Sequence, residues 1–272
     1  MKKKAKKIIL YIVLICICIF MIGPFIWLLI SSILPNTNIY DFPYNISFDK
    51  ISFLNYKEVF EFIDFGKYVL NTVIISGGSV LFNTLLACFT AYPLAKLNFK
   101  GKKVVFSLII SAMIVPTTAG MVVNYLTINN MGLSNTYIGV ILPTAVTIIN
   151  IFNMRQAFLC VPDSIRESGK IEGAIEFRIF IQLILPIVKP SIAVVILFQF
   201  VASWNDFLWP MIVLNDTEKY PLSAALTMLN GQFSYNFGWI AAGIVLSIIP
   251  TVIIFLLTKG MFVDGISGAN KE

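Results

Sequence analysis

Long apolar runs, separated by short polar connections, make up most of this chain. The first uncharged run covers residues 8–34, and the second covers 68–94. Residues 104–154 carry no charge, and a polar, turn-forming patch at 127–135 divides them into two runs. A helix that crosses the hydrocarbon core needs about 20 mostly apolar residues. The pattern therefore predicts six membrane-spanning helices, with bounds near 8–34, 68–94, 104–126, 136–158, 191–214 and 237–257.

The fold class predicted from these runs is an all-α membrane protein. Membrane strands would show short segments of alternating polarity, and these runs do not alternate. Composition agrees, since 58% of the residues are hydrophobic and 12% are charged, against about 25% charged in soluble domains. The first run is much longer than the roughly 7–15 apolar residues of a signal peptide, and no A-x-A cleavage site follows it. It is therefore predicted to be a retained span.

Lysine and arginine predict the orientation of the chain. If the N-terminus lies inside, 16 of the 20 basic residues fall on inner segments, and only Lys50, Lys57, Lys67 and Lys219 fall outside. Basic residues concentrate on cytoplasmic connections, so a basic N-terminus (1–7) and a tail (261–272) are both predicted to be cytoplasmic. They flank one membrane domain, 8–260. Because the basic residues flank spans, the sequence pI of about 9.1 indicates orientation and not binding to nucleic acid.

The residue types present exclude several kinds of chemistry. The chain has no histidine, so neither a Ser/His/Asp set nor a histidine proton relay can form. It also lacks the G-x-x-x-x-G-K-[ST] loop that holds nucleotide phosphates. The cysteines are expected to be packing residues, because none lies on the oxidising side with a partner; they are Cys16, Cys18, Cys88 and Cys160. No catalytic residue, metal site or bound cofactor is predicted.

Charge returns in one compact cytoplasmic segment, 161–190, between the fourth and fifth spans. Asp163 or Ser164 can begin a short helix, and Glu167 stands three residues after Ser164, at capping-box spacing. This helix is expected to end near Ile171. Gly173 then permits a sharp turn that other residues resist. A second short helix is predicted over 175–184, which gives an elbow whose apolar anchors are Ile165, Ala174, Phe177 and Phe180.

The spacing within this elbow resembles a family motif. Permease subunits of binding-protein-dependent ABC importers carry E-A-A, three residues, G, nine residues, then I-x-L-P. This chain has Glu167-Ser168-Gly169, three residues, Gly173, nine residues, then Leu183-x-Leu185-Pro186. The departures are Ser168 and Gly169 for the two alanines and Leu183 for the isoleucine. Gly169 puts the rigidity of the first short helix in doubt, since glycine costs about 1 kcal/mol against alanine inside a helix.

The resemblance implies a fold and a set of partners. The fold is the transmembrane domain of a type I ABC importer, and the elbow is its coupling helix. The partners are a second homologous permease subunit, two ATP-binding subunits and an extracytoplasmic solute-binding protein. The residues expected to serve in ATPase coupling are Glu167, Ser168, Gly169, Glu172, Gly173, Ala174, Phe180 and Pro186. An ordinary amphipathic loop that happens to hold these letters is the plainer alternative.

Three further segments resemble the carbohydrate branch of these permeases, and in particular the smaller of the two maltose-type subunits. They are AYPLAKLNFKGKK (91–103), GLSNTYIGVILP (132–143) and SWNDFLWPMIVL (203–214). The expected function is half of the translocation pathway for a sugar or oligosaccharide. The residues expected along the substrate path are Asn71, Trp204, Asn205 and Asp206. For the tryptophan an interfacial aromatic belt is the alternative, and for Asp206 a capping role. By resemblance, the outer loop 215–236 is a candidate contact for the binding protein.

Two other functions compete with this expectation. A secondary carrier driven by ions places ionisable residues inside its spans, yet here only Asp206 lies within one. A membrane enzyme would need a catalytic set that the chain does not offer. Within the resemblance itself, a permease for a non-sugar solute such as glycerol phosphate is the remaining alternative.

Overall fold

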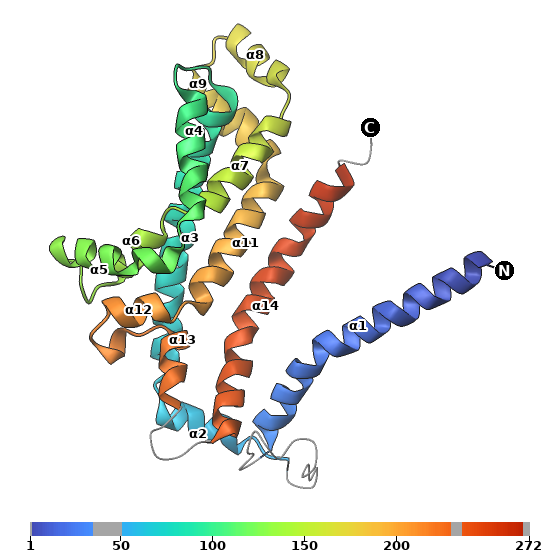
Figure 1. The fold of residues 1–272 in the computed structure, drawn as a ribbon, viewed down its shortest axis with the longest axis vertical. Coiled ribbons are helices and arrows are strands. Elements are labelled where there is room, and N and C mark those ends of the chain that lie inside the picture. The colour runs from blue at the N-terminus through green and yellow to red at the C-terminus, as the bar shows by residue number, and fades with distance from the viewer. Residues whose placement is uncertain (1, 35–50, 230–235, 269–272) are drawn as a thin grey trace. The chain divides into compact units, whose positions relative to one another are not determined.

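The computed structural model describes residues 2–34, 51–229 and 236–268, and every regular element within them is helical (Figure 1). Residues 35–50 and 230–235 of the predicted outer segments, and 269–272 of the predicted tail, lie outside this description. The α-helices are α1 (Lys2–Ile33), α2 (Leu54–Phe62), α3 (Phe65–Lys96), α4 (Lys102–Ser111), α5 (Met121–Asn130), α6 (Tyr137–Thr144), α7 (Ile148–Cys160), α8 (Asp163–Ile171), α9 (Glu176–Arg178), α10 (Leu185–Ile187), α11 (Lys189–Asn205), α12 (Leu208–Val213), α13 (Leu222–Ala225) and α14 (Phe237–Gly268). The remaining turns are 3-10 helices η2 (Ala112–Ile114), η3 (Thr117–Gly120), η5 (Thr217–Lys219) and η6 (Leu226–Leu229), and the π-helix η4 (Ile179–Ile184).

The all-α membrane prediction is confirmed for the described residues. Three helical stretches are long and apolar enough to cross a bilayer, namely Lys6–Ile33, Phe65–Lys96 and Phe237–Lys259. Three further pairs of helices pass the same criterion together, and each pair is bent at a short break. The number of spans rises to six if each bent pair counts as one.

Two of the predicted spans are bent in the structure. The stretch Lys102–Ile114 meets Thr117–Asn130 at 93°, and Tyr137–Thr144 meets Ile148–Cys160 at 49°. At the first break Val115 is extended (φ −78°, ψ 119°) and is followed by Pro116. Proline disfavours the helical region for the residue before it, so the predicted helix over 104–126 divides there.

The predicted continuous helix over 191–214 is wrong. Helix α11 ends at Asn205, and Asp206 has extended backbone angles (φ −72°, ψ 120°). The Asp206 carboxylate accepts a hydrogen bond of 3.3 Å from the backbone N–H of Trp209, in the first turn of α12. A carboxylate that satisfies a free N–H at a helix start favours a new helix over a continuation of the old one, which explains the break.

The chain folds into two compact units. The first holds residues 1–65 and 225–249, and therefore α1, α2, η6 and the first part of α14. In this unit Gly243 of α14 lies against Leu226 and Leu229, since a Cβ added to it would come within 2.5 Å and 3.1 Å of their side chains. Small residues allow such close approach.

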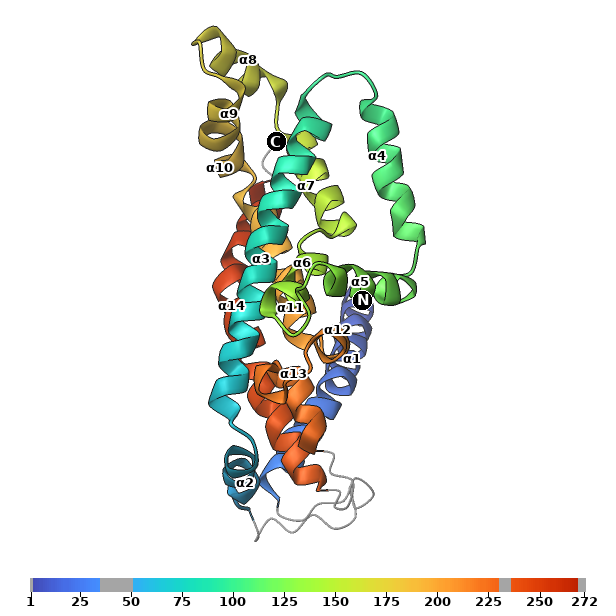
Figure 2. The same ribbon diagram turned by 90° about the vertical axis from the view of Figure 1, so that its left-hand side faces the viewer.

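The second unit holds residues 66–224 and 250–272. Its helices α3, α7 and α11 lie side by side in both ribbon views (Figures 1 and 2). One apolar core, which includes Ala91 of α3, Met154 and Phe158 of α7 and Val195 of α11, runs between them. The helices α8 and α9 stand at one end of α3, and the same core extends to this end through Tyr92 and Ala95. The candidate site is at this end.

A buried polar network supports the break between α6 and α7. The Asn83 side-chain amide donates to the Thr144 carbonyl (3.2 Å) and to Thr147 Oγ1 (3.0 Å), and it accepts from Asn150 Nδ2 (2.6 Å). Gln199 Nε2 donates to the same Thr144 carbonyl (3.3 Å). Backbone groups freed by a break within a span need such partners. Asn83 and Gln199 therefore stabilise the bend in an apolar surrounding.

We expect Gly139→Ala to destabilise the second unit. A Cβ at this position would lie 2.3 Å from the backbone oxygen of Leu133, which cannot move aside cheaply. Overpacking of this kind costs roughly 1–3 kcal/mol, so the midpoint of thermal unfolding in detergent should fall. Gly77→Ala is the matched control, because its added Cβ has no atom within 4 Å. An unchanged midpoint for Gly139→Ala would contradict the expectation.

Candidate functional site

The elbow (residues 161–190) turns at Gly173. Helix α8 ends at Ile171, and Gly173 takes a left-handed conformation with φ +81°. The backbone N–H of Gly173 bonds to the Lys170 carbonyl (3.0 Å), and that of Ala174 bonds to the Gly169 carbonyl (3.0 Å). These two bonds form a Schellman motif, in which glycine is the preferred residue at the left-handed position. The predicted helix end and sharp turn are confirmed.

The predicted capping box is wrong. The N-cap of α8 is Pro162, and no side chain caps this helix. Asp163 accepts a hydrogen bond of 2.6 Å from Lys96 Nζ at the end of α3, and Lys96 also donates to the Val161 carbonyl (2.5 Å). This bond and the lysine's charge lower the pKa of the Asp163 carboxyl. The buried ammonium of Lys96 therefore fixes the start of the elbow to α3, and the carboxylate that was expected to cap is used for this ion pair.

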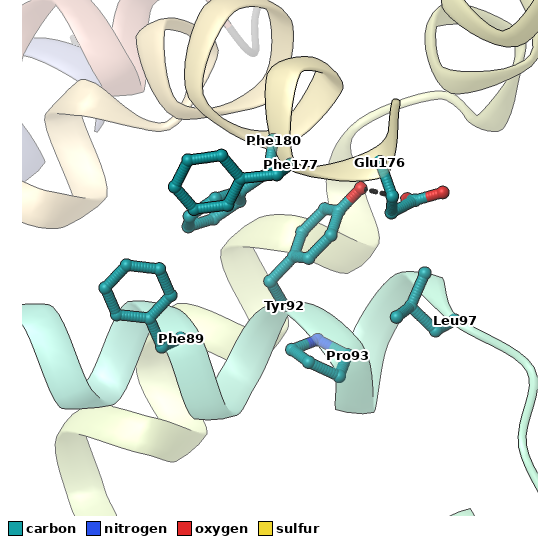
Figure 3. Close-up of a pocket in the computed structure, with 7 residues that line it drawn as sticks. All are labelled: Phe89, Tyr92, Pro93, Leu97, Glu176, Phe177 and Phe180. Carbon is teal, nitrogen blue, oxygen red and sulfur yellow. Dashed lines mark hydrogen bonds between the residues drawn. The ribbon is translucent and has the colours of Figure 1, made fainter. Parts of the chain in front are cut away.

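Glu176 connects both arms of the elbow to α3. Arg166 of α8 donates from Nε (2.7 Å) and Nη2 (3.0 Å) to its two carboxylate oxygens, and Lys170 Nζ lies 3.5 Å away. The Tyr92 hydroxyl of α3 donates to the same carboxylate at 2.5 Å (Figure 3). We call these four residues the Glu176 clamp. The hydrogen bonds that Arg166 donates lower the pKa of the Glu176 carboxyl to about 2, so the pair stays ionised around neutral pH.

The underside of the elbow is part of the apolar core. Phe180 is buried, and its ring centroid lies 4.6 Å from that of Tyr92 and 6.1 Å from that of Phe158. Figure 3 shows Phe180 and Phe177 facing Phe89 and Tyr92 of α3 around a small apolar pocket of about 200 Å³. The elbow is thus packed onto the helices below it and does not extend freely from them.

Gly169 explains a departure from the family pattern. It is buried, and a Cβ there would lie 2.9 Å from Leu183 Cδ1 and 3.0 Å from Ile179 Cγ1. Both neighbours belong to η4, the π-helical part of the second arm. The two arms therefore approach more closely at Gly169 than an alanine allows without a small shift of these side chains.

The tip of the elbow is apolar and exposed. Ile171 is 87% exposed and Ile175 is 70% exposed, and they flank the Gly173 turn. Phe177 is 57% exposed, which corrects its prediction as a buried anchor; Ile165, Ala174 and Phe180 do pack against the core. A pair of isoleucines this exposed on a charged segment indicates a surface that meets a partner.

The predicted coupling residues differ in their exposure. Glu167, Ser168, Glu172, Gly173 and Pro186 have exposed positions, Ala174 is half-buried, and Gly169 and Phe180 are buried. The predicted helix over 175–184 is instead the single turn α9 followed by the π-helix η4. A π-helix widens the turn, and here it lets Ile179, Phe180 and Ile184 all face the core.

The predicted substrate-path residues lie elsewhere in the second unit. Asn71 is buried; its amide donates to the Glu218 and Tyr220 carbonyls (2.8 and 2.9 Å) and accepts from the Tyr137 hydroxyl (2.7 Å). These bonds give Asn71 a structural role and lend no support to a place in a substrate path. Trp204 is buried and stacks on Phe200, with ring centroids 5.2 Å apart. The exposed Asn205 and the half-buried Asp206 follow it at the break after α11.

Sequence reasoning missed the residues that hold the elbow in place. Tyr92, Lys96, Arg166 and Glu176 were not singled out, because their importance comes from partners that are distant along the chain. Ile171 and Ile175 were also missed. Their symmetric position on either side of Gly173 is a local signal that could have identified them, since apolar residues that flank an exposed turn are uncommon.

We expect Lys96→Met to loosen the start of the elbow. The substitution leaves the Val161 carbonyl and the Asp163 carboxylate without their donor, and an unsatisfied buried acceptor costs roughly 1–3 kcal/mol. Cleavage by trypsin after Arg166 and Lys170 should therefore become faster in the purified protein. Asp163→Asn is the control: Asp163 is mostly exposed and such pairs contribute about 1 kcal/mol or less, so it should change the rate little. Equal rates for Lys96→Met and the unmodified chain would contradict this role.

Comparison with known proteins agrees with the geometry. Residues 83–263 match the family described as binding-protein-dependent transport system inner membrane component. The arabinooligosaccharides transport system permease protein AraQ of Bacillus subtilis (strain 168) is 32% identical over 251 residues, which cover 90% of this chain and 88% of AraQ. The melibiose/raffinose/stachyose import permease protein MelC of the same organism is 32% identical over 225 residues, 81% of this chain and 82% of MelC.

A solved structure shows the same fold. It is the crystal structure of a bacterial ABC transporter involved in the import of the acidic polysaccharide alginate. One of its chains superposes with a TM-score of 0.84 at 24% identity, covering 96% of this chain and 98% of that one. The family match spans more than half of the sequence and two permeases share 32% of their residues with it, so this chain belongs to the family of inner membrane components of binding-protein-dependent transport systems.

Proposed function

We propose that this chain forms half of the passage of an ATP-driven importer for oligosaccharides. As a member of its family, it is a multi-pass permease subunit of the cell membrane and is not itself an ATPase. The substrate class is supported by the relatives, whose names specify arabinooligosaccharides, melibiose, raffinose and stachyose, and galactooligosaccharides. All of these are short saccharides. The remaining subunits are a second permease, two ATP-binding subunits and a solute-binding protein.

The elbow is the proposed docking element for the ATP-binding subunit. The observation that carries this proposal is the exposed apolar tip, Ile171 and Ile175, on a turn that the Glu176 clamp and the Lys96 ion pair fix to α3. A partner that binds the tip can therefore move α3, because these bonds fix the elbow rigidly to that helix. The distribution of lysine and arginine supports a cytoplasmic location for the elbow and for both termini.

Along the substrate path, Asn205 and Asp206 remain the candidates of this chain. Asn205 is exposed, although its amide donates to the Val201 carbonyl at 2.8 Å within α11. Asp206 is half-buried and accepts a hydrogen bond from the Trp209 backbone N–H in the first turn of α12. Their amide and carboxylate oxygens can accept hydrogen bonds from sugar hydroxyls, which is the chemistry an oligosaccharide needs. Trp204 and Asn71 are assigned to the support of this region.

Uptake by the assembled transporter tests the proposal. The chain, its partner permease, the ATP-binding subunits and the binding protein would be reconstituted in liposomes with ATP inside. A panel of labelled saccharides and glycerol phosphate would then be offered outside. We expect uptake of one or more oligosaccharides that stops when ATP or the binding protein is omitted.

Two outcomes would contradict the proposal. Uptake of glycerol phosphate without any saccharide would show that the substrate class is wrong. Uptake by liposomes that hold this chain alone, driven by an ion gradient, would contradict the ATP-driven mechanism, because the proposed permease has no motor of its own.

A further inference from the structure

Helix α2 connects the end of one span to the start of another within the first unit. Its Asn55 side chain donates to the carbonyls of Ser32 (3.0 Å) and Leu34 (2.9 Å), at the end of α1. Its Glu58 accepts a hydrogen bond of 2.5 Å from Trp239 Nε1, near the start of α14. Carbonyls at a helix end have no partner within the helix, so Asn55 completes α1. The position of α2 is therefore set by two membrane helices at once.

The length of α1 places this junction at the membrane surface. The apolar stretch Lys6–Ile33 has 28 residues, which makes it about 42 Å long at a rise of about 1.5 Å per residue. The hydrocarbon core is about 30 Å thick, and the bilayer with its headgroup layers is about 40–45 Å. A helix of this length reaches from one headgroup layer to the other. Because Asn55 binds its last carbonyls, α2 lies at the depth of a headgroup layer.

The exposed side of α2 divides into an aromatic stripe and a charged stripe. The aromatic stripe holds Phe53 and Phe60, which are 71% and 53% exposed. Tyr56 lies between them but is half-buried, and its hydroxyl is 2.8 Å from Ser32 Oγ of α1. These positions share one helical face by their spacing. Phe53 lies against Tyr56 with ring centroids 6.0 Å apart, and Phe60 lies edge-on to Phe65 at 5.0 Å. Among the described residues, Phe53 and Phe60 keep more than half of their side-chain surface uncovered.

The charged stripe lies on a neighbouring face. Lys57 and Glu61 form an exposed pair one turn apart, with 3.6 Å between Nζ and Oε1, and Asp64 follows them on the exposed surface. Val59 and Ile63 face inward and are buried. The buried face of α2 thus packs against the protein, its charged stripe is suited to water, and its aromatic stripe is suited to an apolar medium.

We propose that α2 is an interfacial anchor whose exposed rings, Phe53 and Phe60, insert into the lipid at the headgroup boundary where α1 ends. Aromatic rings are favoured at this depth, and a helix with an apolar and a charged face lies in the plane of the interface. The lipid is the occupant that the geometry favours over a protein partner, since the stripe starts directly beside the end of a lipid-spanning helix. The anchor holds the ends of α1 and α14 at a fixed depth.

Spin labels on single cysteines test the anchor in the assembled transporter in liposomes. The four native cysteines would be replaced, and one label would be placed at Phe60→Cys, at Phe53→Cys, or at the control Glu61→Cys. Collisions with oxygen, which concentrates in lipid, and with a water-soluble nickel chelate would be measured for each label. We expect the ratio of oxygen to nickel collisions to be severalfold higher at positions 53 and 60 than at 61.

Two results would overturn the proposal. Equal ratios at the three positions, with free access for nickel, would place the stripe in water. Labels at 53 and 60 that neither reagent reaches would show that a protein covers the stripe. Position 53 lies outside the helix proper as its N-cap, so its label reports even where a change at 60 disturbs packing against Phe65.

Discussion

Gly173→Glu is expected to abolish uptake while the chain still inserts and folds. A Cβ at Gly173 meets no atom within 4 Å, so the new side chain has space within this chain. The substitution does strain the backbone, because a non-glycine residue in the left-handed conformation (φ +81°) is destabilised by about 1–2 kcal/mol. The larger effect is external, because a charged side chain would stand between Ile171 and Ile175 on the apolar tip. Uptake of the labelled saccharide should fall to background.

Two matched glycines separate docking from backbone strain. Gly101 (φ +86°) and Gly132 (φ +69°) also have left-handed backbones and no atom within 4 Å of an added Cβ. Gly101→Glu and Gly132→Glu therefore carry a similar strain at turns away from the elbow. Both should keep most of the uptake. If Gly101→Glu abolishes uptake as fully as Gly173→Glu, the loss comes from strain and the elbow has no special role. Co-purification with the ATP-binding subunit should be lost only for Gly173→Glu.

The elbow could be predicted from sequence because its signals are local. The turn at Gly173 needs only a residue that tolerates positive φ, and the helix before it ends where the Schellman bonds close. The apolar runs could be recognised for a similar reason, since the composition of each run shows by itself that the run is suited to lipid. Local composition determines these features, and no distant partner is needed.

The bends and the clamp could not be predicted in the same way. The break at Asp206 depends on a carboxylate that bonds to the backbone N–H of Trp209. A capping role for Asp206 was one alternative from the sequence, but the apolar run around it does not show that the helix ends there. From the sequence Asp163 was a reasonable helix cap, but in the structure its carboxylate binds Lys96, which lies 67 positions earlier. Glu176 likewise does not stand out from the other charged residues in the sequence, and only the fold places the Tyr92 hydroxyl beside it. Pairings across long separations are decided by packing, which a single sequence does not display.

The Glu176 clamp is expected to set how much transport each ATP supports. Glu176→Ala removes the partner of Arg166, Lys170 and Tyr92 together, so the two arms of the elbow can move against each other and against α3. The side chains of Arg166 and Glu176 are partly exposed, which limits the lost interaction energy to about 1 kcal/mol. We therefore expect uptake per ATP hydrolysed to fall without being abolished. ATP hydrolysis itself should persist, since the tip residues are unchanged and the subunits still assemble.

A double-mutant cycle distinguishes the clamp from general damage to the elbow. Arg166→Ala should lower uptake per ATP about as much as Glu176→Ala, and the double variant should be no worse than either single one, because residues that act through one contact are not additive. Arg178→Ala is the control, since the Arg178 side chain donates to the exposed Gln182 side chain (2.8 Å), takes no part in the Glu176 clamp and lies on the same arm. If the effects of Arg166→Ala and Glu176→Ala add in full, or if Arg178→Ala uncouples transport as strongly, then the elbow transmits force without this clamp. Tyr92→Phe refines the result, because it keeps the ring against Phe180 and removes only the hydroxyl that ties Glu176 to α3.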